Sequence, residues 1–289
     1  MNKKERNCTR ILVDGIHFMN SAYGLAEVSF AELDLKHAAF YCMLFRLRHV
    51  MTYWDSVDVV IGWPDLDSPI RNKLIPSYRD IAYYKDERWM DCKEWMNDYM
   101  VDLARIGFTA QLSSTGLDGV DLLAHIAKHD KDRYHVILSR DNRVLQCLSD
   151  NTAVQIDLRT EREGTPQVVT KKDFIAQFEL QPEQWPILLG YAGNRSDNLS
   201  GIRGVGHTGI LKYLNGVDVS PKLKNLVEAS WADAQVQIKV NTLPIAEFEL
   251  ESPPMNRYDS REAIQVLKEH KLDFDTTNKF WSNIGEGHV

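Results

Sequence analysis

Two aspartates follow short apolar runs in this sequence. Asp14 ends the run Ile11-Leu12-Val13, and Asp141 lies just beyond the run at 135–139. Runs of this length are typical of buried parallel strands, whose carboxyl ends meet at one edge of a sheet. Carboxylates gathered there are ligands for a hard divalent cation, although a single strand-end aspartate can equally cap a helix or close a turn. Two aspartates at equivalent positions favour an acidic site.

A glycine-rich segment is the second candidate site. Gly201, Gly204 and Gly206 precede a helix that we expect at 208–214. Glycine lets the backbone approach a phosphate closely, and the first turn of a helix offers free N–H groups. The basic side chains around the segment outnumber Asp197; they are Arg195, Arg203, His207 and Lys212. This pattern predicts phosphate contacts, but a plain glycine turn between two helices would have the same spacing.

Two histidines share a helix face with an acidic residue. His125 and His129 follow Asp121 at intervals of four residues, so all three side chains lie on one side of the helix expected at 118–129. A metal site that uses imidazole is one interpretation. A solvated helix face is the interpretation we favour.

The elements that must position these residues alternate along the first half of the chain. Apolar runs predict strands at 11–14, 57–61, 135–139 and 153–157, and apolar periodicity predicts helices at about 30–53, 87–106 and 118–129. This alternation predicts an α/β fold with a parallel sheet flanked by helices. From about residue 170 the pattern becomes helical, with Thr170 as an N-cap and a last helix at about 260–270.

Composition limits the class of protein. The chain has 289 residues, a net charge of -7 and a pI of about 5.7, so bulk charge gives no support for nucleic-acid binding, although a local basic patch remains compatible with it. The four cysteines form no CxxC pair, which argues against a zinc site and a disulfide framework. No apolar run approaches the length of a membrane span, and no secretory signal is evident. We therefore expect a cytoplasmic protein, not secreted, with no membrane partner.

Several segments, in order, resemble one known family. SDNLSGIRGVGHTGILKYL resembles the SDN-x-x-G-x-x-G-x-G segment of the 5′ nucleases, which are flap endonucleases and 5′→3′ exonucleases. Further similar segments are ILVDG, SPIRNKLIPSYRD, GLDGVDLLAHIA, VILSRDNRVLQCL and, near the end, LKEHKLDFDTTNKFW. The resemblance implies a PIN-like core at 1–169 with a helical arch region at about 71–107. It also implies a helix-hairpin-helix subdomain at 170–289, with K⁺ as a candidate ion at its hairpin.

The resemblance also implies a chemistry. The family hydrolyses phosphodiesters near a 5′ end or flap with two divalent ions, usually Mg²⁺ or Mn²⁺, held by about seven carboxylates. The matching acidic positions are the candidate catalytic residues Asp14, Asp118, Asp121, Asp141 and Asp197, of which the first four would hold metal. At other ligand positions of the family this chain has Trp63, Val120, Arg143 and Asn194.

Arg143 has the largest consequence among these replacements. A guanidinium at a ligand position repels a divalent ion and can pair with Asp141 or Asp197. We therefore expect at most one ion. Asp65 and Asp67 lie near Trp63 and would substitute for its missing carboxylate only after a shift of their loop.

The resemblance implies two DNA-binding surfaces. The residues before the arch that match basic positions of the family are Arg71, Lys73 and Arg79, and the hairpin contributes Arg195, Gly201, Arg203, Gly204, Gly206 and Lys212. The sequence from Arg71 to Arg105 contains seven basic and seven acidic residues, so the arch region has no net charge. The aromatic side chains there could stack on bases, but packing on the core is favoured; they are Tyr83, Tyr84, Trp89 and Trp95.

Three hypotheses follow. The first is a 5′-nuclease homologue that binds DNA ends, flaps or junctions with weak or absent cleavage. The second is an active nuclease that uses one metal. The third is a non-catalytic scaffold subunit in a replication or phage assembly, which the acidic net charge and the neutral arch region favour. Separately, a compact 5′ nuclease without an attached polymerase resembles phage proteins and some bacterial paralogues.

Overall fold

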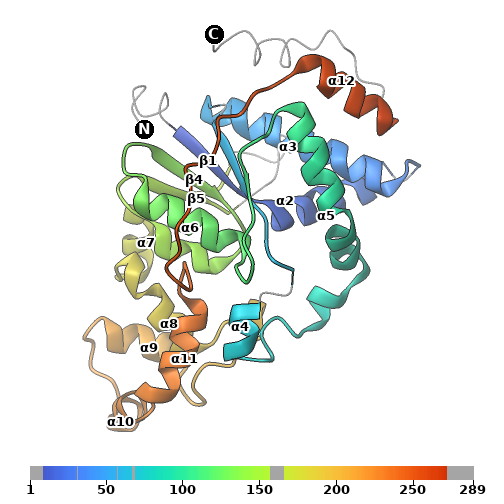
Figure 1. Ribbon diagram of the computed structural model, residues 1–289. Helices are drawn as coiled ribbons and strands as arrows, with labels where there is room; N and C mark the ends of the chain where they lie inside the picture. The colour runs from blue at the N-terminus through green and yellow to red at the C-terminus, as the bar shows by residue number, and fades with distance from the viewer. Residues whose placement is uncertain (1–8, 31, 57, 67–68, 157–165, 272–289) are drawn as a thin grey trace.

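The computed structural model describes residues 9–30, 32–56, 58–66, 69–156 and 166–271, and it contains a mixed α/β fold (Figure 1). Its six-stranded sheet has the order β3-β2-β1-β4-β5-β6, and the strands are parallel except for the antiparallel β6. The strands are β1 (Thr9–Asp14), β2 (Val59–Gly62), β3 (Gln111–Leu112), β4 (Tyr134–Leu138), β5 (Thr152–Gln155) and β6 (Val168–Val169). No described helix is long and apolar enough to cross a bilayer.

The helices fall into a core set and a C-terminal set. The core helices are α2 (Gly15–Ser29), α3 (Leu35–Trp54), α4 (Pro69–Leu74), η1 (Ala82–Lys85), α5 (Glu87–Ile106), α6 (Gly119–His129) and η2 (Asn142–Cys147). The later helices are α7 (Lys171–Phe178), η4 (Pro182–Gln184), α8 (Trp185–Ala192), η5 (Arg195–Asp197), α9 (His207–Leu214), α10 (Pro221–Ala229), α11 (Trp231–Asn241) and α12 (Ser260–Glu269).

The α/β fold and its parallel core are confirmed, and so are the four predicted strands within the described residues. The ends of two predicted strands, residues 57 and 157, lie outside the described residues. Asp67 and the segment beyond residue 271 lie outside them as well. The helix expected at about 30–53 is wrong at its start, because α3 begins at Leu35 and α2 was not predicted. The sequence did not predict α2 because this helix is buried on several sides. Its apolar residues, which include Ile16, Phe18 and Met19, are spread around the helix and form no single apolar stripe.

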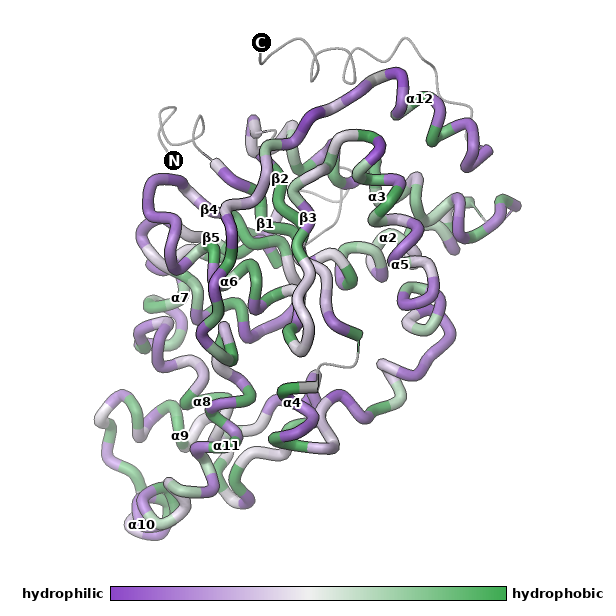
Figure 2. The backbone as a smooth tube through the Cα atoms, viewed as in Figure 1, coloured by the Kyte–Doolittle hydropathy of each residue, from purple (hydrophilic) through white to green (hydrophobic). Residues whose placement is uncertain are grey.

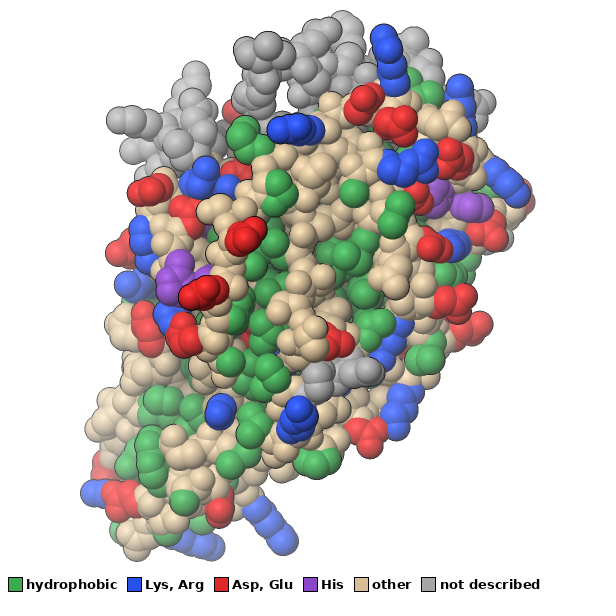
Figure 3. Space-filling view, viewed as in Figure 1, with side chains coloured by type: hydrophobic (Ala, Val, Ile, Leu, Met, Phe, Trp, Pro, Cys, Tyr) green, Lys and Arg blue, Asp and Glu red, His purple; other side chains and the backbone are tan. Residues whose placement is uncertain are grey.

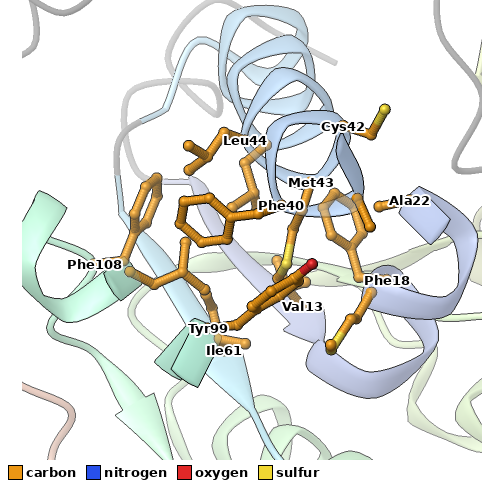
Figure 4. Packing of buried hydrophobic residues seen from close by; sticks show 14 of the residues in the cluster. Val13, Phe18, Ala22, Phe40, Cys42, Met43, Leu44, Ile61, Tyr99 and Phe108 are labelled. Carbon is orange, nitrogen blue, oxygen red and sulfur yellow. The ribbon is translucent and has the colours of Figure 1, made fainter. Parts of the chain in front are cut away.

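The two faces of the sheet bury alternate residues of the same strands. Val13 and Ile61 pack against α2, α3 and α5 (Figure 4), whereas Leu12 and Val60 pack under α6 and the later helices. The central strands are therefore apolar on both sides, and the tube in Figure 2 has the hydrophobic colour along β1 and β2. α12 returns to the first face and packs on α5.

The C-terminal helices are tied to the core through side-chain bonds to the backbone. Trp185 Nε1 donates to the carbonyl of Asn142 at 2.8 Å, and Gln146 Nε2 donates to the carbonyl of Asn241 at 2.9 Å. Asn142 and Gln146 belong to η2, which follows directly from Asp141. The lower part of the molecule in Figure 1 is thereby fixed to the carboxyl edge of the sheet.

Two glycines bring α6 onto the end of β2. A Cβ added at Gly62 would lie 2.6 Å from the carbonyl oxygen of Gly119, and one added at Gly119 would lie 2.4 Å from the carbonyl oxygen of Gly62. Any larger residue would push the start of α6 away from the sheet. The position of Asp118 and Asp121, which begin this helix, depends on this contact.

We expect Gly62→Ala to lower the free energy of unfolding by about 1–3 kcal/mol, because a methyl group has no room between these backbones. Gly206→Ala is the matched control, since a Cβ at Gly206 would meet nothing within 4 Å. Urea unfolding followed by circular dichroism measures both. Equal stabilities of the two variants would contradict this account of the junction.

Candidate functional site

Five buried aspartates converge at the carboxyl edge of the sheet. Asp14 ends β1, Asp141 follows β4, Asp118 and Asp121 begin α6, and Asp197 lies in η5. None has more than 6% of its surface exposed. The hydroxyl of Ser139 joins the first two, because it donates to Asp14 at 2.6 Å and accepts from the backbone N–H of Asp141 at 3.0 Å.

Arg143 lies in the middle of these carboxylates. Its Nη2 is 2.5 Å from Asp141 and 2.9 Å from Asp118, and its Nε is 3.3 Å from Asp197. Its side chain is fully buried. Asp141 also caps η2 by accepting from the backbone N–H of Arg143 at 2.9 Å, so a local turn places the guanidinium against the carboxylates.

Two further arginines complete what we call the arginine–aspartate network, which comprises Arg71, Arg79, Arg143, Asp118, Asp121, Asp141 and Asp197. Arg79 donates from Nε to Asp197 at 2.8 Å and from its two terminal nitrogens to Asp118 and Asp141, each at 3.3 Å. Its φ of 55° lies in the left-handed region, which costs a residue with a side chain about 1–3 kcal/mol. The surrounding ion pairs must hold it there.

Arg71 binds Asp121 through both terminal nitrogens, at 2.5 and 2.9 Å, and donates from Nε to the carbonyl of Val240 at 3.0 Å. Asp121 also accepts from the backbone N–H groups of Asp118 and Ile245, at 2.9 Å each. The sequence suggested Arg71 as a DNA contact, but its fully buried side chain is not available to one. The ion pair of Arg71 with Asp121 therefore joins α4 and α6 to the segment after α11.

The charges of the network reinforce one another. Burial alone would raise the pKa of Asp141, but the guanidinium groups of Arg143 and Arg79 outweigh burial and hold that pKa well below its usual value. Burial alone would lower the pKa of Arg143, and the carboxylates of Asp141 and Asp197 raise it instead. Asp141 and Arg143 are therefore both charged near neutral pH.

Two residues of the site were not predicted from the sequence. Tyr78 donates its hydroxyl to Asp118 at 2.8 Å, and His17 Nδ1 lies 3.1 Å from Asp14. Burial alone would lower the pKa of His17, but Asp14 outweighs it and the pKa is raised. His17 follows Asp14 by three residues, and that spacing on a helix starting at residue 15 was the available signal.

Sequence comparison finds a DNA polymerase and a 5′-3′ exonuclease among the proteins similar to this chain. It is 32% identical over 176 residues to the thermostable DNA polymerase I of Thermus thermophilus, a match that covers 57% of this chain and 20% of the relative. It is 24% identical over 225 residues to a 5′-3′ exonuclease of Mycoplasmopsis pulmonis, covering 76% of this chain and 70% of the relative. These relatives support the resemblance of the chain to the 5′-nuclease family.

Other comparisons agree in fold. Flap endonuclease-1 from Methanococcus jannaschii superposes with a TM-score of 0.64 at 13% identity, over 96% of this chain and 93% of that one. A variant of the bacteriophage T5 flap endonuclease, in a pseudo-enzyme-product complex with DNA and metal ions, superposes with a TM-score of 0.59 at 16% identity, over 96% and 99%. No family model matches the chain, and it spans about a fifth of the Thermus polymerase.

The positions where this chain departs from the carboxylates of the 5′ nucleases are filled by other contacts. The indole of Trp63 is fully buried over Gly15, where an added Cβ would lie 2.5 Å from the ring, and its Nε1 donates to Gln111 at 2.8 Å. Val120 packs in the apolar cluster under α6. Asn194 Nδ2 donates to Asp197 at 2.9 Å.

The network does not fit a divalent-metal site. A cation needs free carboxylate oxygens, whereas the oxygens of Asp118, Asp141 and Asp197 face guanidinium groups. Among the residues described, no group of three or more His, Cys, Asp or Glu side chains is arranged to hold a metal ion. The imidazole alternative also lacks its carboxylate, because Asp121 binds Arg71. The rings of His125 and His129 lie 4.3 Å apart at a tilt of 33°.

The hairpin expected to contact phosphate lies between η5 and α9 and is open to solvent. Gly201 and Gly204 have φ values of 63° and 91°, in the region that favours glycine. A Cβ at Gly201 would lie 2.3 Å from the backbone nitrogen of Gly193, so the turn folds tightly on the end of α8. The exposed basic side chains around it are Arg195, Arg203 and Lys212; Lys73 on α4 is exposed as well.

We expect Arg143→Met to lower the free energy of unfolding by about 3–5 kcal/mol, because it leaves buried carboxylates without their partner. Arg140→Met is the matched control: the same change at an exposed neighbouring residue should stay within about 0.5 kcal/mol of the parent. Urea unfolding at pH 7 compares them. A loss no larger than that of the control would show that Arg143 does not hold the site together.

The stability contributed by Arg143 should depend on pH. The pKa of Asp141 is lowered in the folded state, so this contribution is fully present above the pKa of an unfolded aspartate, about 3.9, and is lost as the pH falls further. The difference in unfolding free energy between the parent and Arg143→Met should be constant from pH 7 to about pH 5 and shrink below about pH 4. A difference that does not change between pH 7 and pH 3.5 would contradict the ion-pair assignment.

Proposed function

We propose that this chain binds DNA at 5′ ends, flaps or junctions and does not cleave it by the metal-dependent reaction of its family. The observation that carries the proposal is Arg143, buried between Asp118, Asp141 and Asp197. Divalent ions in such nucleases activate water and stabilise the departing oxygen. Because arginine side chains already neutralise these carboxylates, we propose that no metal ion binds there to activate water or to stabilise the departing oxygen.

The same arginines support DNA binding without metal. A site of bare carboxylates repels a phosphate unless cations neutralise it. Here the guanidinium groups of Arg71, Arg79 and Arg143 supply three positive charges against the four carboxylates of the network. The repulsion of a phosphate at this edge of the sheet is therefore reduced without a bound ion.

The hairpin supplies the second DNA contact. The backbone turn at Gly201 and Gly204 and the exposed side chains of Arg195, Arg203 and Lys212 offer N–H groups and positive charge to a phosphate backbone. Structural neighbours contain DNA at comparable folds, among them the bacteriophage T5 flap endonuclease and human GEN1 with a Holliday junction. We propose K⁺ as a candidate ion at this hairpin.

An active single-metal nuclease is the second candidate function. Asp14 supports it, because this carboxylate contacts Ser139 and His17 and lies at the edge of the arginine–aspartate network. Such an enzyme would need Arg79 and Arg143 to leave Asp118 and Asp141. A scaffold role with a protein partner is the third candidate.

The test is a gel shift and cleavage assay with labelled 5′-flap DNA. We expect binding in EDTA that changes less than about twofold when Mg²⁺ or Mn²⁺ is added, and no product, because the positive charge is built into the chain. Product that requires metal and disappears in Asp141→Ala would instead establish the single-metal nuclease. Absence of DNA binding would favour the scaffold.

A pair of variants locates the contact. Arg203→Ala at the hairpin should weaken binding to every DNA tested and reduce the slope of log affinity against log salt by about 1. Arg261→Ala is the control, since Arg261 is exposed on α12 at the opposite end of the molecule in Figure 1. Equal effects of the two variants would contradict binding at the hairpin.

A further inference from the structure

Two histidine rings meet where the last described helix docks on the core. His37 lies in the first turn of α3, and His270 directly follows α12. Their Nδ1 atoms are 3.0 Å apart, and His270 Nε2 lies 2.9 Å from Asp102 Oδ2 on α5. The row of Asp102, His270 and His37 therefore connects three helices. Figure 3 shows histidine side chains among acidic and basic ones on the side of the molecule where α12 ends.

The docking of α12 depends on few contacts. The helix has 10 residues, and an isolated helix of that length is unstable in water. Among its described side chains three are buried in the core; they are Ala263, Val266 and Leu267. The buried ring of His270 adds a further contact, because it stacks on Phe40 with ring centroids 4.2 Å apart. A change in the polar row at the end of α12 therefore has a large effect on its docking.

The contact between the two Nδ1 atoms needs one proton between them. A ring nitrogen of histidine donates when it is protonated and accepts when it is not. When both rings are neutral, or when one of them is an imidazolium, one Nδ1 donates and the other accepts. When both rings are imidazolium ions, two N–H groups and two positive charges face each other across 3.0 Å. The hydrogen bond is then replaced by repulsion.

The neighbouring charges determine which ring stays neutral. A positive charge on His270 has the carboxylate of Asp102 as its partner. Burial lowers the pKa of His37, and the adjacent His270 lowers it further. His37 is therefore the neutral acceptor near neutral pH, and it takes the second proton. The other charged groups around the pair come from all three helices and the residues next to them; they are Asp34, Lys36, Asp98, Arg105, Glu262, Glu269 and Lys271.

The chain before α12 is held by bonds that do not titrate. The backbone N–H of Arg257 donates to the carbonyl of Gly107 at 3.0 Å, and that of Asp259 donates to the carbonyl of Ile106 at 3.1 Å. These bonds fix the start of α12 to the end of α5, whereas the histidine pair holds the other end of the helix. Loss of the pair therefore frees α12 from its C-terminal end and leaves the preceding segment in place.

We propose that His37 and His270 form a latch that holds α12 on the core at neutral pH and releases it in mild acid. The pKa of His37 is lowered in the folded state. The stability that the latch contributes is therefore fully present above the pKa of an unfolded histidine, about 6.5, and is lost as the pH falls further. Both histidines lie outside the arginine–aspartate network, so the latch does not depend on the proposed function.

The experiment measures amide hydrogen exchange at about pH 7.5 and about pH 5.5, with each rate divided by that of the unstructured chain at the same pH. In the parent, we expect the protection of residues 263–269 to fall about five- to tenfold, since one pH unit below the unfolded value corresponds to at most about tenfold. Residues 122–127 of α6 are the internal reference and should change by less than about twofold. His37→Asn keeps a group that bonds His270 Nδ1 without titrating, so it should remove the fall. His129→Asn, at an exposed site on α6, should retain it.

Two results would overturn the latch. One is unchanged protection of α12 in the parent between the two pH values, and the other is an equal fall in the parent and in His37→Asn. A second measurement on the parent alone decides the matter if the asparagine variant does not dock α12 at either pH. Nuclear magnetic resonance of the carbon-bound ring protons of His37 follows its protonation, and the midpoint should coincide with that of the loss of protection. Clearly separate midpoints would also overturn the assignment.

Discussion

The contact of Arg143 with Asp118, Asp141 and Asp197 is the interaction on which the rest of this site depends. Carboxylates buried this deeply cannot stay charged without a cation, and a single cation must reach three elements of the fold to serve them all. The guanidinium does so because it is planar and presents several donors at fixed angles. It joins the end of β4, the start of α6 and the helix before the hairpin, so that the core and the C-terminal helices share one electrostatic centre.

A guanidinium and a divalent ion neutralise carboxylates in different ways. An ion is exchangeable, takes ligands from a substrate and polarises water, whereas an arginine side chain is placed once, when the chain folds. The arrangement of Arg71, Arg79 and Arg143 thus keeps the buried carboxylates of this fold while it reduces their repulsion of a phosphate. It leaves those carboxylates without free oxygens for a divalent ion.

The sequence was sufficient for the fold and for part of the site. Apolar runs located β1, β2, β4 and β5 because strands buried on both faces are continuous in sequence. The position of Arg143 against Asp141 was predictable because the two are neighbours in the chain. The pairing of Arg71 with Asp121 was not, since it depends on how α4 packs near α11, and neither was the fully buried indole of Trp63. Two-residue strands such as β3 carry too little pattern to be found.

The indole of Trp63 over Gly15 has a consequence for the history of the chain. An aspartate in place of this tryptophan would leave a void beneath the sheet edge. An aspartate in place of Arg143 would remove the partner of the buried carboxylates of Asp118, Asp141 and Asp197 and add a fourth buried negative charge. Each reversal alone produces a chain that folds less well and still lacks a complete metal site. Recovery of an all-carboxylate site would therefore require several substitutions at once, because each single reversal lowers the stability of the fold.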